Sequence, residues 1–136
     1  MRQVFESFAG LDNFAVYLVV SLAYLAVFIA LYIRVTPYRE FQLIREGNNA
    51  ASFSLSGSIL GFVIPLASAV QHSVSLVDMA IWGLIAMLVQ IAAFVAVKLM
   101  LPSITQDIPA NKGAQGFFLG CMSLAVGVLN AACMSY

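Results

Sequence analysis

The stretch AVYLVVSLAYLAVFIALYI, residues 15–33, contains no charged residue over its whole length. A helix needs about 20 mostly apolar residues to cross the hydrocarbon core of a bilayer. The stretch is followed directly by Arg34, whose charge belongs at the membrane–water interface rather than within it. It therefore predicts a membrane-spanning helix from about Phe14 to Val35.

Three further segments have comparable length and apolar character, at about 50–71, 76–101 and 114–135. Within the third span, Asp78 and Lys98 lie near the ends, where charged side chains can reach the interface. The chain is 62% hydrophobic and 9% charged, whereas soluble domains are about half apolar and about one quarter charged. We expect an all-α polytopic membrane protein with four transmembrane helices in two hairpins, forming one domain over residues 1–136.

The basic residues predict the orientation of these spans, because Lys and Arg accumulate in cytoplasmic loops. The formal net charge is 0, so no basic field suggests a nucleic-acid partner. We expect the first and third loops to be cytoplasmic and both termini to lie outside, with membrane lipids as the surrounding partners. The residues in or beside those two loops are Arg34, Arg39, Arg45, Lys98 and Lys112, against Arg2 on the other side.

The first loop, RVTPYREFQLIREGNN at residues 34–49, has helix signals of its own. Thr36 can cap a helix with Pro37 at its first position, and Gly47 can end it. This pattern predicts a short helix along the cytoplasmic interface; the alternative is that the segment extends the first span beyond the membrane. Such a helix would put Tyr38, Phe41 and Ile44 on one side and turn Arg39, Glu40 and Glu46 largely away from it.

The outer loop, near residues 71–75, contains the polar residues that most resemble a site. Ser75 followed three residues later by Asp78 is similar to a capping box. We therefore interpret Asp78 as part of a helix cap in preference to a catalytic acid. His72 is the one histidine, and a soft metal site with Cys133 and Met79 is conceivable, although no spacing specifies it. We therefore expect no catalytic residues, no metal site and no cofactor, and hence no enzyme.

Small residues define one face on each of two spans. The second span includes SFSLSGSILGFVIPLASA, residues 52–69, and the fourth contains a GxxxG pair. Small residues allow close backbone packing between membrane helices, and Pro65 cannot donate to the Gly61 carbonyl, which favours a bend there. The expected helix-packing residues are Gly57, Gly61, Pro65, Gly116, Gly120 and Gly127.

Three polar side chains, Ser68, Gln90 and Asn130, lie within the predicted spans. Lipid would leave an amide unsatisfied, so these groups should face another helix or a wet cavity. The first hypothesis is hydrogen bonding between helices. The second is that they line the pore of a small-solute or ion channel formed by several subunits.

The run LIREGNNAASFSLSGSILGFVIPLASAVQHSVSLVDMAIWG and the ending GVLNAACMSY resemble the bacterial membrane family catalogued as domain of unknown function 350, the YjfL-like family. The resemblance extends over about residues 34–136 and implies a small polytopic inner-membrane protein without an established activity. It also implies a link to envelope stress, with a membrane-stress protein as partner. We expect an oligomeric membrane subunit or scaffold, with the oligomeric channel as the alternative.

Overall fold

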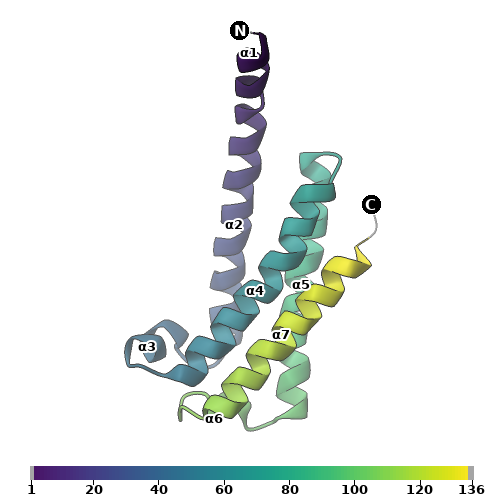
Figure 1. The fold of residues 1–136 in the computed structure, drawn as a ribbon. Helices are drawn as coiled ribbons and strands as arrows, with labels where there is room; N and C mark the ends of the chain where they lie inside the picture. The colour runs from purple at the N-terminus through teal and green to yellow at the C-terminus, as the bar shows by residue number, and fades with distance from the viewer. Residues whose placement is uncertain (1, 135–136) are drawn as a thin grey trace.

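The computed structural model describes residues 2–134, which form helices joined by short loops and contain no strand (Figure 1). Four helices are long and apolar enough to cross a membrane, and their bounds lie within three residues of the predicted spans. The predicted all-α architecture with four spans is therefore confirmed. The helices are α1 (Arg2–Ala9), α2 (Leu11–Val35), α3 (Glu40–Arg45), α4 (Asn49–His72), α5 (Leu76–Met100), α6 (Ile104–Asp107) and α7 (Gly113–Cys133).

The short helices α3 and α6 lie at one end of the bundle, whereas α1 and the end of α7 lie toward the other (Figure 1). We call the first of these the loop end. Arg39, Arg45 and Lys112 belong to its connections, so the basic loops of the sequence meet at one end of the molecule.

The closest helix pair is α4 with α7, which come from different hairpins (Figure 1). A Cβ atom added at Gly57 would meet the backbone of Gly120, and one added at Gly127 would meet the backbone of Gly61. A Cβ at Gly116 would meet the backbone at the start of α4. The two small-residue faces therefore lie against each other within one chain, and α4 continues as one helix through Pro65.

Helix α2 is attached to α4 and α5, mainly through its loop-end half. The rings of Phe28 and Phe62 stack with centroids 4.5 Å apart, and Tyr32 meets Phe94 edge-on at 5.6 Å. Farther out, the Tyr24 hydroxyl donates to the Ala80 carbonyl at 2.7 Å. Phe28 and Tyr32 are the buried residues of α2, so most of this helix presents its side chains outward.

The loop after α2 differs from its prediction. The Thr36 amide donates to the Tyr32 carbonyl at 3.0 Å, so Thr36 closes α2 instead of capping the next helix. Helix α3 then begins at Glu40 rather than at Pro37. Gly47 ends α3 as expected, because its φ of 83° lies in the left-handed region that glycine adopts without steric cost.

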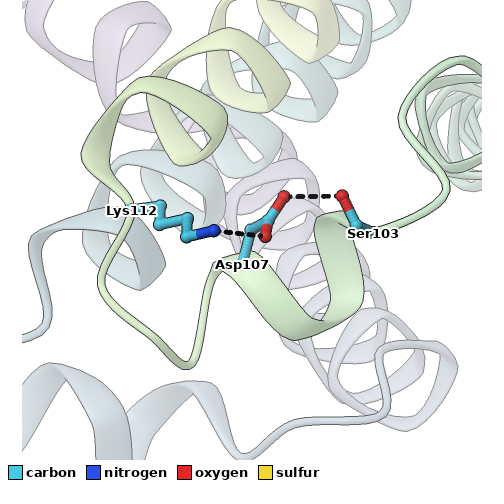
Figure 2. A network of polar contacts seen from close by, with 3 residues as sticks. All are labelled: Ser103, Asp107 and Lys112. Atoms are coloured by element: carbon cyan, nitrogen blue, oxygen red, sulfur yellow. Dashed lines mark hydrogen bonds and ion pairs between the residues drawn. The ribbon is translucent and has the colours of Figure 1, made fainter.

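A network of polar contacts organises the loop between α5 and α7 (Figure 2). Ser103 donates to the Asp107 carboxylate at 2.9 Å, and Lys112 pairs with the same carboxylate at 3.3 Å. These contacts hold α6 against the start of α7, as Figure 2 shows.

Asn48 joins the two loops at this end. Its side-chain oxygen accepts from the Ala51 amide at 2.9 Å and so caps α4, while its Nδ2 donates to the Ile108 carbonyl at 2.9 Å. From the loop between α6 and α7, the side-chain oxygen of Asn111 accepts a hydrogen bond from the Ala50 amide at 3.2 Å. The two hairpins are therefore hydrogen-bonded to each other at the loop end.

Replacing Asn48 with alanine is expected to lower the free energy of unfolding by about 2 kcal/mol, since it removes a helix cap and leaves a buried carbonyl without its donor. Chemical unfolding in detergent followed by circular dichroism measures the change. The neighbouring Asn49→Ala serves as control, because Asn49 is exposed at the first position of α4. Equal losses in the two variants would contradict a specific role for Asn48.

Candidate functional site

The connection from α2 to α3 has an alternating pattern of burial. Because residues on an extended segment alternate between two sides, every second side chain here faces the bundle. Thr36, Tyr38 and Glu40 are buried, whereas Pro37, Arg39 and Phe41 are exposed. The prediction that Tyr38 shares a side with Phe41 and that Glu40 lies largely elsewhere is therefore wrong, because Tyr38 and Glu40 are buried together and only 1% of the Glu40 surface is accessible.

A helical period over residues 36–47 does not predict this burial, because it places Tyr38 and Glu40 on different sides of the segment. Thr36 ends one helix, and Arg39, the N-cap of α3, has φ −87° and ψ 94°, which is extended backbone. The pre-proline position of Thr36 favours an extended conformation as well. A period of two over residues 36–40 would have placed Glu40 beside Tyr38 on the inner side.

Helices α2 and α4 complete the surroundings of Glu40. The Tyr32 side chain reaches it from α2, and the hydroxyls of Ser54 and Ser58 lie beside the phenols of Tyr38 and Tyr32. We call the set Tyr32, Thr36, Tyr38, Glu40, Ser54 and Ser58 the Glu40 cluster. All its members are buried.

Several oxygen atoms of the Glu40 cluster lack a hydrogen-bond partner. Both carboxylate oxygens of Glu40 and the hydroxyls of Tyr32 and Tyr38 make no hydrogen bond of good geometry. The hydroxyls that lie nearest to them are those of Thr36, Ser58 and Ser54. Those serines are engaged elsewhere: Ser54 donates to the Ala51 carbonyl at 3.1 Å, and Ser58 to the Ser123 hydroxyl at 3.3 Å. A buried polar group without a partner costs about 1–3 kcal/mol, and a charged one costs more.

Burial raises the pKa of the Glu40 carboxyl to about 7, and the neighbouring Thr36 hydroxyl offsets this only in part. Burial and the Glu40 charge raise the pKa of Tyr38 well above its usual range, so this phenol stays protonated. A carboxyl with a pKa near 7 changes charge over the pH range in which cells operate, as carboxyls at functional sites commonly do.

An open pocket of about 340 Å³ lies beside this cluster at the loop end. Thr36, Tyr38 and Glu40 line it from the cluster, and Arg39 and Gln42 also contribute to its wall. Among residues 2–134, no ion pair joins Arg39 to Glu40. The pocket therefore lies beside Glu40, whose two carboxylate oxygens are themselves buried.

The polar residues predicted to lie within the membrane occupy separate places. Gln90 is buried in the core, and its Nε2 donates to the Ser123 carbonyl at 2.8 Å, which joins α5 to α7. Ser68 lies beside His72 one turn away on α4, with 3.5 Å between Oγ and Nδ1. The Asn130 amide nitrogen is buried on α7 without a hydrogen-bond partner. No contact in the described part of the chain joins Ser68, Gln90 and Asn130.

The residues of the loop between α4 and α5 include helix caps. Ser75 accepts from the Asp78 amide at 3.1 Å, and the Asp78 carboxylate accepts from the Val74 amide at 3.2 Å. The ring of His72 contacts the Ser68 carbonyl oxygen at 3.0 Å. Across the described residues, no group of three or more His, Cys, Asp or Glu side chains could hold a metal ion.

The comparisons with known proteins agree with this architecture. The sequence model of the family described as Domain of Unknown Function (DUF350) matches residues 6–134. The chain is 41% identical over 123 residues to UPF0719 inner membrane protein YjfL of Escherichia coli K12, covering 90% of this chain and 93% of that protein. It is 28% identical over 128 residues to UPF0719 transmembrane protein YshE of Bacillus subtilis, covering 90% and 92%. No solved structure matches.

Proposed function

This chain belongs to the family described as Domain of Unknown Function (DUF350), and from that premise we propose that it is a membrane subunit that assembles with further copies of itself through α2. The proposed assembly lies in a bacterial inner membrane and acts as a scaffold, without a reaction of its own. Its first and third loops face the cytoplasm, where the basic residues of both loops gather and a membrane-stress protein is the proposed partner.

The incomplete packing of α2 carries this proposal. In an apolar 18-residue segment of α2, only 6% of the residues are buried, whereas the figure for the corresponding segment of α4 is 44%. The small-residue faces of α4 and α7 pack against each other, so the glycines of these faces are engaged within the chain. Helix α2 is the span whose sides remain open.

Apolar grooves flank α2 on two sides. One of about 360 Å³ lies between α2 and α5 and is lined by Val19, Tyr24 and Leu84, among others. Another of about 270 Å³ lies between α2 and α4. Helices in membranes associate through van der Waals packing, and side chains of a second copy would supply the contacts that these grooves lack.

Cysteine cross-linking in native membranes tests the proposal. In a background with Cys121→Ser and Cys133→Ser, Val19→Cys is expected to form a disulfide-linked dimer upon mild oxidation. The matched control is Leu129→Cys on α7, because Val19 is 64% and Leu129 65% exposed. We expect Leu129→Cys to remain a monomer.

Equal cross-linking of the two variants would indicate random collision in the membrane. That result, together with a monomeric mass in lipid nanodiscs across a wide range of protein concentration, would rule out assembly through α2.

A further inference from the structure

We propose that the Glu40 cluster binds one monovalent metal cation, Na⁺ or K⁺, at the loop end of the bundle. This inference concerns the interior of the chain and is independent of the α2 assembly proposed above.

The donor atoms of the cluster are all oxygens. The Glu40 carboxylate contributes two, Thr36 a hydroxyl, and Tyr32 and Tyr38 phenol oxygens. The hydroxyls of Ser58 and Ser54 lie beside those two phenols. No sulfur or imidazole belongs to the set, so it suits hard cations, which prefer carboxylate, carbonyl and hydroxyl oxygens. Soft and borderline metals would gain no preferred ligand here.

The charge of the cluster selects a monovalent ion. Glu40 is its one carboxylate, and its other oxygens belong to hydroxyl and phenol side chains. One positive charge therefore balances the site, whereas a divalent ion would leave an excess positive charge in a buried place. Calcium sites in proteins usually combine several carboxylates with six to eight oxygens.

The atoms that a cation would contact are those without partners. Glu40 is 1% and Tyr32 0% exposed, yet both Glu40 oxygens and the Tyr32 hydroxyl make no hydrogen bond. The hydroxyl of Tyr38, which is 8% exposed, makes none either. A buried charge is tolerated when it is paired or coordinates a metal, and the described structure offers Glu40 no ion pair.

The pocket lies on the outer side of the cluster. Thr36, Tyr38 and Glu40 line this open cavity of about 340 Å³, while the carboxylate and phenol oxygens are buried behind it. Arg39 lines the same cavity and is exposed, so its positive charge disfavours the approach of a cation from this side.

Direct binding to the full chain in an uncharged detergent at pH 8 tests the proposal. Equilibrium dialysis with radiolabelled Na⁺, or with Rb⁺ as a K⁺ analogue, is expected to show saturable binding of a single ion per chain. Exchanging N-methylglucamine chloride for NaCl or KCl at equal ionic strength is expected to raise the melting temperature by about 4 °C, because the ion binds only the folded state.

Glu40→Gln is expected to abolish both the binding and the shift in melting temperature. Tyr38→Phe keeps the carboxylate and removes one ligand oxygen, so it is expected to weaken binding by about tenfold or more. The latter variant keeps the test valid if Glu40→Gln fails to fold. Glu46→Gln, an exposed neighbour on the same loop, is expected to behave as the unaltered chain.

Absence of saturable Na⁺ or Rb⁺ binding in the unaltered chain would overturn the proposal. So would a melting temperature that responds to pH but to neither cation, because Glu40 would then be neutralised by a proton alone. Unchanged binding in both Glu40→Gln and Tyr38→Phe would place the ion elsewhere and would equally refute it.

Discussion

Replacing Gly127 with alanine is expected to lower the free energy of unfolding by about 3 kcal/mol, at the upper end of the usual cost of overpacking. The added Cβ would meet backbone atoms of Gly61 on α4, which cannot rotate away as a side chain can. Relief requires α4 and α7 to separate, and this pair forms the closest contact in the bundle. Unfolding in mixed micelles, followed by circular dichroism, measures the loss.

The matched control is Gly113→Ala on the same helix. A Cβ at Gly113 meets no atom within 4 Å, so this variant is expected to show no loss. Similar stability of the two variants would mean that α4 and α7 do not approach each other at Gly127.

The second large effect concerns pH. In buffers without Na⁺ or K⁺, the unaltered chain is expected to lose about 3 kcal/mol of stability as pH rises from about 4.5 to about 7, because the Glu40 carboxyl ordinarily has a pKa of 4.5 and the fold raises it to about 7. Over that interval the folded chain holds a proton that the unfolded chain has released. Stability from this group is therefore complete below pH 4.5, falls as pH rises, and stays low above pH 7.

Glu40→Gln is expected to remove this dependence. The variant should equal the unaltered chain near pH 4.5 and exceed its stability above pH 7, since a neutral amide carries no buried charge. Thermal unfolding at several pH values in an uncharged detergent provides the profiles, with the exposed Glu46→Gln as control. Parallel profiles for all three chains would show that Glu40 is hydrated or paired in solution.

The spans and the glycine faces follow from local properties of the chain, and both could be predicted. The length of an apolar run decides whether it can cross a bilayer, so residues 15–33 were sufficient to place α2. The cap by Ser75 and Asp78 was equally predictable, because both partners lie within three residues of each other.

Contacts between distant parts of the chain could not be predicted. Asn48 is an ordinary helix cap by its sequence, and only the fold shows that it also donates to the Ile108 carbonyl. The burial of Glu40 depends on where α2 ends and on how α4 passes beside the loop. A carboxylate in a loop is normally solvated, and only tertiary placement turned this one into a candidate site.

The position of α2 also bears on which helix face could mediate self-association. A GxxxG pair is commonly taken as the dimerisation face of a membrane helix, and Gly116 and Gly120 match it. In this fold they contact α4 of the same chain. Self-association, if mediated by a span, is therefore expected at the large aliphatic residues of α2 rather than at the glycines.

The pairing of α4 with α7 has a consequence for how the protein is made. These helices belong to the first and second hairpin, so the interface between them cannot form until the last span has been synthesised. During translation, the glycine face of α4 therefore remains unpaired in the lipid until α7 has been inserted. The chain is expected to be most exposed to proteases and to pairing with a wrong helix at the stage when only the first hairpin has been inserted.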